Sequence, residues 1–256
     1  MARRTQFKLM EDLYMESLSD FGDVMFEVRN RNCVFSPALT LWLFLNQRTG
    51  NGISLSKSLH EFNDGKGRRL FEERTETRKG KVIPLSMNTG GFSKARHRLS
   101  LELVKDITKA ISCKVRLNSS SKSTWRGIKV YLLDGTRIDL PCTPDIEQHY
   151  PRSSNQHGKV QNPKMLCMFM HDLVTGVALN PAYGAWRGSK ATSEQALSKE
   201  ILPEAEKGSL ILGDRNFGVF SVAHAAQLSG HQVLFRLTSS RAKKLFGKDF
   251  EKKKAD

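Results

Sequence analysis

Two aspartates follow apolar segments in the second half of the chain, where α/β proteins often carry their chemistry. Asp134 comes directly after a partly β-branched run at 128–133, and Asp214 comes shortly after a second run at 209–212. Because ligands bind at the carboxyl ends of strands in open α/β sheets, the two carboxylates are candidates for one site. Paired carboxylates repel each other unless a cation neutralises them, and Mg²⁺ is the hard ion that oxygen ligands select. Such a pair on a basic protein is typical of metal-assisted phosphodiester chemistry.

Both aspartates also have a structural interpretation. Asp134 precedes Gly135, a pair that is common in turns, and an aspartate ahead of a helix is a common N-cap. Spacing alone therefore leaves the catalytic and the structural interpretations of Asp134 and Asp214 open.

Other polar residues near these positions are more simply explained by structure. Asp139 lies five residues after Asp134 along an extended segment, so their side chains should point to opposite faces. Glu194 lies in the first turn of a predicted helix, where the helix dipole favours a carboxylate. Three neighbouring candidates for a metal site match no zinc motif: Cys142, His149 and His157.

The elements that position the two aspartates follow from the apolar pattern after residue 127. Two helices are predicted, one from the Thr192-x-x-Gln195 capping-box pattern to about 206 and one over 217–228. The predicted strands are 128–133, continuing past a glycine to 140, then 165–170, 177–179, 209–212 and 232–237. The order β-β-β-α-β-α-β predicts a mixed α/β domain.

The first half of the chain has the apolar period of helices. Ser36 and Pro37 form an N-cap and first-turn pair ahead of an apolar stretch that stops at Gly50. A short helix is predicted over 53–62, and a long one is predicted from Ser93 to about residue 111. Residues 63–87 are polar and predict a loop, and the serine-rich segment 118–123 predicts a linker.

The charge of the chain favours a polyanionic partner, nucleic acid before membrane. The 256 residues carry a formal net charge of +15, and residues 65–116 hold 14 basic against 5 acidic side chains. The predicted helix from Ser93 carries Lys94, Arg96 and Arg98, which we expect to contact phosphates.

Several protein classes are excluded by the sequence. The apolar stretch 38–45 is too short to span a bilayer, and the acidic residues Glu11 and Asp12 argue against a signal peptide. The four cysteines are far apart and form no C-x-x-C pair, which argues against a disulfide scaffold or a zinc finger. We expect a cytoplasmic, nucleoid-associated protein with reduced thiols and no membrane partner.

Five blocks of sequence, spread over most of the chain, identify a family. Leu-Asp-Gly-Thr-Arg-Ile-Asp-Leu-Pro at 133–141 contains the first aspartate, and Gly-Asp-Arg-Asn-Phe at 213–217 contains the second. The other blocks are Phe35-Ser36-Pro37 with Trp42 and Gln47, the segment 88–96, and Phe235-Arg236 with the basic stretch after it. In this order the blocks resemble the bacterial DDE transposases of the insertion-sequence-four group, whose catalytic domain is ribonuclease-H-like.

The resemblance implies a role for each matched residue. Asp134 and Asp214 would be catalytic ligands of Mg²⁺ or Mn²⁺, and Arg215 would support Asp214 or touch phosphate. The partner would be double-stranded DNA, both element ends and target, and a homodimer on DNA is allowed. The reaction would be hydrolytic nicking at the element end, followed by attack of the new 3′-hydroxyl on target DNA. Further DNA contacts are expected from the basic C-terminal part, at Arg236, Arg241, Lys243 and Lys244.

One part of the family pattern is missing. The family has a third acid, a glutamate in a Tyr-x-x-Arg-x-x-x-Glu block, and after Phe235 this chain has only Glu251, which we do not assign as catalytic. We therefore expect a truncated transposase, and the missing acid leaves open whether this chain alone is active or inactive. The alternatives are a non-catalytic DNA-binding remnant or regulator that occupies element ends, and a ribonuclease-H-like nuclease.

The predicted fold is an α/β, ribonuclease-H-like mixed sheet, incomplete at its C-terminus, preceded by an all-helical region. The predicted domains are a helical DNA-binding region at 1–117, a linker at 118–126, a partial catalytic core at 127–240 and a basic tail at 241–256, where the missing insertion would start.

Overall fold

The computed structural model describes residues 2–22, 25–26, 34–49, 52–67, 84–118, 124–155, 158–159 and 161–247. The chain divides into two compact units, Met1–Lys114 and Val115–Asp256. The predicted linker begins four residues after this division, and its centre at 119–123 lies outside the described residues. Among the helices that are described, none is long and apolar enough to cross a membrane.

In the described part of the first unit, the regular elements are all helices. Its core surrounds Trp42, which is fully buried and packs against Tyr14 with 5.3 Å between ring centroids. The Tyr14 hydroxyl donates to the carbonyl of Ala38 at 2.7 Å, which ties the first helix to the second. The helices are α1 (Ala2–Leu18), η1 (Ser19–Phe21), α2 (Pro37–Thr49), α3 (Leu55–Asn63), α5 (Thr89–Arg98) and α6 (Leu101–Asn118).

The start of α2 is confirmed, because the Ser36 hydroxyl accepts a hydrogen bond from the Leu39 N–H at 3.2 Å. The predicted end of this helix at Gly50 lies outside the described residues, as does most of the predicted loop at 63–87, over 68–83.

The single helix predicted from Ser93 is wrong, since the structure has two helices there, α5 and α6. The Asn88 side chain caps α5 by accepting from the Gly90 N–H at 2.9 Å, so this helix starts before Ser93. Ser100 then caps α6 by accepting from the Leu103 N–H at 3.1 Å. Apolar periodicity continued across the break, and a lone serine does not interrupt such a pattern.

The second unit contains a five-stranded mixed sheet in the order β5-β4-β1-β6-β7. Strand β1 pairs antiparallel with β4, which pairs antiparallel with β5, while β1, β6 and β7 run parallel to one another. This order and these directions are those of a ribonuclease-H-like sheet, so the predicted fold class is confirmed. The strands are β1 (Val130–Asp139), β4 (Lys164–Asp172), β5 (Ala182–Ala185), β6 (Leu210–Gly213) and β7 (Gln232–Phe235).

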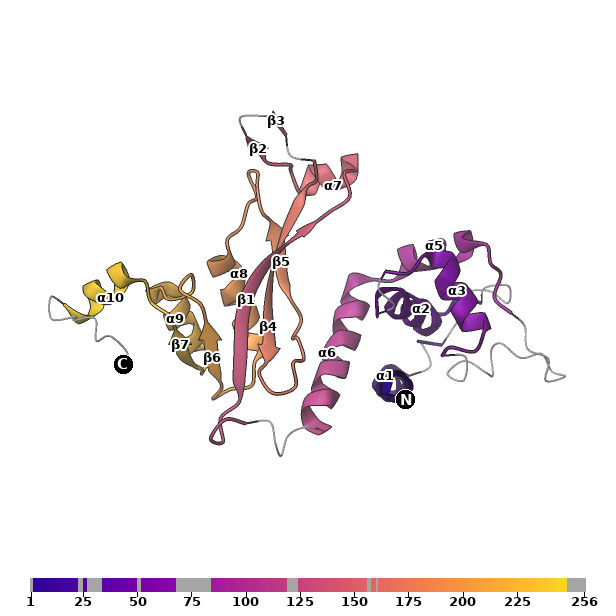
Figure 1. Cartoon of the computed structure of the whole chain (residues 1–256), viewed down its shortest axis with the longest axis horizontal. Helices are drawn as coiled ribbons and strands as arrows, with labels where there is room; N and C mark the ends of the chain where they lie inside the picture. The colour runs from indigo at the N-terminus through magenta and orange to yellow at the C-terminus, as the bar shows by residue number, and fades with distance from the viewer. Residues whose placement is uncertain are drawn as a thin grey trace. The chain divides into compact units, whose positions relative to one another are not determined.

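Helices and a small hairpin complete the second unit. Figure 1 shows β1 as the long central arrow, with helix α7 (Pro144–His149) and the hairpin of β2 (Ser154–Asn155) and β3 (Gly158–Lys159) beyond its end. Helix α8 (Glu194–Ile201) continues into η4 (Leu202–Glu204) and precedes β6, and α9 (Phe220–Leu228) connects β6 to β7.

The two faces of the sheet differ in their cover. On one face, Tyr131, Leu133 and Ile211 are buried in a core shared with Leu197 of α8 and Val222 of α9. On the other face the in-register row Leu132, Leu212 and Leu234 is partly open, with Leu132 39% and Leu234 63% exposed. Because side chains alternate along a strand, Asp134 shares this open face with Leu132.

Two local predictions in the second unit are corrected. The third strand is Ala182–Ala185 rather than 177–179, where Ala178 forms only an isolated bridge to His171. The N-cap of α8 is Ser193 rather than Thr192, since the Ser193 hydroxyl accepts from the Ala196 N–H at 3.1 Å. The strand was missed because small residues and a glycine carry little β signal.

The segment from Arg241, predicted as a basic tail, begins inside a helix. Helix α10 (Ser239–Phe246) is capped by Thr238, whose hydroxyl accepts from the Arg241 N–H at 3.3 Å. Lys and Arg are good helix formers, so a basic segment with a cap needs no wide apolar stripe to be helical. Residues 248–256 lie outside the described part.

Candidate active site

Strand pairing brings Asp134 and Asp214 to equivalent positions on neighbouring parallel strands. The last pair between β1 and β6 is Leu133 with Gly213, and each aspartate is the next residue along the chain. Both carboxylates are exposed. Asp134 lies within its strand, because β1 continues to Asp139 through its pairing with β4, as the predicted continuation past the glycine to 140 requires.

A basic residue extends the same row. Gly213 pairs with Phe235 of β7, so Arg236 follows this pair as Asp214 does, and its N–H donates to the carbonyl of Gly213 at 3.2 Å. A Cβ on Gly213 would lie 2.9 Å from the Phe235 ring and 3.0 Å from the Phe217 ring, so close packing favours glycine there. One row across the parallel strands β1, β6 and β7 therefore contains, in this order, Asp134, Asp214 and Arg236.

The turn after β6 fixes the backbone around Asp214. One oxygen of the Asp214 carboxylate accepts from the N–H of Asn216 at 2.8 Å, and the Asp214 carbonyl accepts from the N–H of Phe217 at 3.2 Å. The Arg241 guanidinium in α10 donates to the carbonyl of Arg215. On the neighbouring strand, an Asp134 carboxylate oxygen accepts from the N–H of Gly135 at 2.8 Å.

Two residues at the start of α8 also hold this turn. Glu194 accepts from the side-chain amide of Asn216 at 2.5 Å, and Gln195 donates to the Asn216 carbonyl at 3.0 Å. The sequence predicted for Glu194 only the favourable effect of the helix dipole. Only the packing of α8 against the β6 turn brings it beside the aspartate segments.

The chemistry of the donors fits a hard divalent cation. Asp134 and Asp214 offer carboxylate oxygens, which Mg²⁺ and Mn²⁺ prefer over nitrogen and sulfur. Among the described residues there is no group of three His, Cys, Asp or Glu side chains arranged for a metal ion.

The predicted DNA-contacting residues fall into two groups, one in each unit. Arg215, Arg236, Lys243 and Lys244 are exposed in the second unit, on the elements that follow Asp214, while Arg241 is half-buried by its contact with Arg215. Lys94 and Arg98 are exposed on α5 of the first unit, one helical turn apart.

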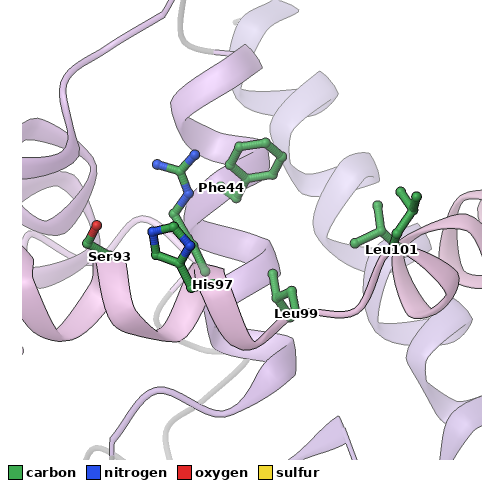
Figure 2. A pocket seen from close by; sticks show the side chains of 7 residues that line it. Phe44, Ser93, His97, Leu99 and Leu101 are labelled. Carbon is green, nitrogen blue, oxygen red and sulfur yellow. The ribbon is translucent and has the colours of Figure 1, made fainter. Parts of the chain in front are cut away.

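Arg96 differs from its two basic neighbours on α5. It is half-buried, and its guanidinium lies 4.9 Å from the centroid of the Phe44 ring, a cation–π distance. Figure 2 shows Phe44, His97 and, at the α5–α6 connection, Leu99 around a pocket that Arg96 also lines. The volume of this pocket is about 380 Å³. Arg96 therefore packs α5 against α2, whereas Lys94 and Arg98 face outward.

The three tryptophans of the chain lie in different environments. Trp42 is buried in the first core, and Trp186 is half-buried beneath Arg137 and Arg187, whose guanidinium carbons lie 4.8 and 4.2 Å from its ring. Trp125 is 51% exposed with Arg126 above its ring. His157, one of the weak zinc candidates, lies outside the described residues.

Comparison with known proteins agrees with the resemblance in the sequence. Transposase InsG for insertion sequence element IS4, from Escherichia coli (strain K12), is 23% identical to this chain over 137 residues. The chain is thus similar, at low identity, to a transposase of the insertion-sequence-four group. The match covers 53% of this chain and 30% of InsG, so the chain spans less than a third of the length of that relative. No protein-family model matches the chain.

Two solved structures of transposases were also found. The Mos1 transposase paired-end complex with left transposon end has 12% identity and a TM-score of 0.28, covering 81% of this chain and 60% of that one. The Mos1 mariner paired-end complex with Mn has 13% identity and a TM-score of 0.27, covering 86% and 65%. With scores this low, the fold assignment rests on the strand order of the sheet.

Proposed function

We propose that the chain is part of an insertion-sequence transposase that binds double-stranded DNA and carries two carboxylate ligands for the metal-dependent cleavage and transfer of a DNA strand. The observation that carries the proposal is the register of the sheet. It aligns Asp134, Asp214 and Arg236 across three strands, and these residues lie in sequence blocks that resemble the insertion-sequence-four transposases.

Asp134 and Asp214 would hold Mg²⁺ or Mn²⁺, and a bound divalent cation would neutralise charge developing on the attacking and leaving oxygens of a phosphodiester. The chain's own residues position the DNA. Arg236 beside the carboxylates and Arg215 in the following turn offer guanidinium groups that can bind a phosphate through two parallel hydrogen bonds. The nucleophile would be water for nicking and then a DNA hydroxyl for transfer.

The first unit would bind DNA through the exposed face of α5. Lys94 and Arg98 are the exposed Lys and Arg side chains of this helix, and Arg96 orders the helix through its contact with Phe44. Contacts of this kind to phosphates give affinity without sequence preference and depend strongly on salt.

Metal binding tests the carboxylate pair directly. Mn²⁺ binding to the purified chain is measured by electron paramagnetic resonance, with Mg²⁺ as competitor, for wild type, Asp134→Asn and Asp214→Asn. We expect each substitution to weaken Mn²⁺ binding at least about tenfold. Asp139→Asn is the matched control, because Asp139 is exposed on the same strand and pairs with Lys164. Equal Mn²⁺ binding by all four proteins would overturn the proposal.

A nicking assay separates the proposal from its alternatives. Supercoiled plasmid DNA is incubated with the chain and Mg²⁺, and nicked product is measured. Nicking that Asp134→Asn abolishes supports a catalytic chain, and cutting of many unrelated DNAs favours the ribonuclease-H-like nuclease. Salt-dependent DNA binding without nicking supports the non-catalytic remnant or regulator. The lack of nicking would then follow from weak metal binding by only two carboxylates.

A further inference from the structure

The start of helix α8 contacts both segments that carry the aspartates. Ser193 caps the helix, and Glu194 is its first residue. The helix dipole explains why a carboxylate is tolerated there, but it does not explain where the carboxylate points. In the structure it accepts from the side-chain amide of Asn216 at 2.5 Å, across 22 residues of sequence.

Asn216 transmits this contact to Asp214. The Asn216 side-chain amide donates to the Glu194 carboxylate, and the Asn216 backbone carbonyl accepts from the Gln195 side chain at 3.0 Å. The Asn216 backbone N–H donates to the Asp214 carboxylate at 2.8 Å. Two consecutive residues of α8 thus fix the residue that orients one oxygen of Asp214. Removing the Glu194 contact frees the Asn216 side chain and loosens the N–H that orients the carboxylate.

Glu194 also lies against the strand that carries Asp134. A Cβ on Gly135 would be 2.8 Å from both Cγ and Cδ of Glu194, so the side chain occupies the space that any larger residue would need. Side chains alternate along a strand, so Asp134 points to the face opposite the one that Glu194 contacts. Glu194 therefore lies behind Asp134, where it cannot share a cation with that carboxylate.

We propose that Glu194 is a positioning residue for the two aspartates: it orients Asp214 through Asn216 and supports β1 behind Asp134, and it does not bind the metal itself. The proposal rests on the proposed function, because it assigns Glu194 a role only if Asp134 and Asp214 bind a divalent cation. It also accounts for glycine after the first aspartate, since Gly135 makes room for the Glu194 side chain.

The test compares three substitutions by Mn²⁺ binding and thermal unfolding. Glu194→Ala and Asn216→Ala should each weaken Mn²⁺ binding about tenfold, the usual effect of losing a partner of a metal ligand. Glu194→Gln should stay within about twofold of wild type, because a glutamine carbonyl still accepts from the Asn216 amide. The double substitution Glu194→Ala with Asn216→Ala should be no weaker than either single one, since both break the same contact.

Two further variants sharpen the comparison. Gly135→Ala should displace the Glu194 side chain and weaken Mn²⁺ binding as Glu194→Ala does. Glu200→Ala, an exposed glutamate of the same helix, is the matched control and should bind Mn²⁺ as wild type does. If Glu194→Gln loses as much Mn²⁺ binding as Glu194→Ala, Glu194 is a ligand and the proposal is wrong. If Glu194→Ala lowers only the melting temperature, its role is structural and the proposal is equally wrong.

A measurement without metal separates this proposal from the proposed function. Hydrogen exchange of the Asn216 backbone N–H should be faster in Glu194→Ala than in wild type and should return to the wild-type rate in Glu194→Gln. If wild type binds no Mn²⁺, or if Asp134→Asn and Asp214→Asn change nothing, the proposed function fails and the role of Glu194 in metal binding fails with it. Unchanged Asn216 exchange in Glu194→Ala overturns the positioning role even where the two aspartates do bind Mn²⁺.

Discussion

The buried carboxylate of Asp172 should be the most sensitive polar group of the second unit. It ends β4 with 1% of its side chain exposed, and its two oxygens have separate partners. One accepts from the N–H groups of Val174 and Thr175, both at 2.9 Å, and the other pairs with the Lys129 ammonium at 3.1 Å. Asp172 thus closes the turn after β4 and joins it to the segment just before β1.

The expected magnitude follows from these three contacts. Asp172→Ala removes a charged acceptor from two N–H donors and breaks a buried ion pair, so we expect a loss of about 3–5 kcal/mol in the free energy of unfolding. Asp172→Asn keeps an oxygen for the turn and loses the charge, so about 1–3 kcal/mol is expected. Asp139→Ala is the control, because its pair with Lys164 is exposed at the other end of the same two strands and should contribute about 0–1 kcal/mol.

The pH dependence of stability gives a second expectation for Asp172. Burial favours the protonated form, but hydrogen bonds from Thr175, Lys129 and Val174 outweigh it and lower the pKa of this carboxyl. A carboxyl with a lowered folded-state pKa stabilises the protein above its unfolded pKa of about 3.9 and loses that contribution as pH falls through the folded pKa. The stability difference between wild type and Asp172→Asn should therefore be constant near neutral pH and shrink below about pH 4.

Urea unfolding followed by circular dichroism at several pH values measures both expectations. A cost of Asp172→Ala no larger than that of Asp139→Ala would refute the reasoning about the buried contacts. A wild-type to Asp172→Asn difference that stays constant down to pH 2 would refute the assigned direction of the pKa.

Three other predictions concern packing, capping and DNA binding. Gly67→Ala should destabilise the first unit by about 2–4 kcal/mol in thermal unfolding, because its Cβ would lie 1.9 Å from the Trp42 indole nitrogen at a φ of +77°. Gly65→Ala shares the positive φ without any atom within 4 Å and should cost about 1 kcal/mol, so equal costs would contradict the packing argument. Ser193→Ala should cost about 1 kcal/mol because it removes the N-cap of α8, and Thr192→Ala should cost clearly less, so equal costs would contradict the cap at Ser193. Replacing Lys94 and Arg98 by Ala should weaken duplex binding and reduce the slope of log affinity against log salt by about 1.8, measured by fluorescence anisotropy. Arg96→Ala should lower the melting temperature of the first unit more than it changes that slope, and an unchanged slope in the Lys94 and Arg98 variant would refute phosphate contact by α5.

Much of the second unit could be predicted from local patterns. The apolar run at 165–170 predicted a buried strand and lies within β4, and the runs at 209–212 and 232–237 correspond to β6 and β7. Apolar periodicity is a local property, so it survives without knowledge of the fold. The break between α5 and α6 and the strand Ala182–Ala185 escaped, because a serine cap and a small-residue strand leave the apolar pattern nearly unchanged.

The candidate site could also be predicted only in part from the sequence. The chain's residue types and order were enough to single out Asp134 and Asp214 and to indicate a basic, DNA-directed protein. Glu194 was predicted only as a residue favoured by the helix dipole, because its partner Asn216 lies 22 positions away in the chain.

The sequence by itself determined the composition of the site, which is two acids after apolar runs with basic residues around them. It also determined the order in which strands and helices follow one another along the chain. Only the tertiary structure decided their arrangement, through the pairing of Leu133 with Gly213 and of Gly213 with Phe235 that aligns Asp134, Asp214 and Arg236. The physical reason is that strand register and helix docking are set by contacts between segments far apart in the chain, and a shift of one residue would turn Asp134 to the covered face.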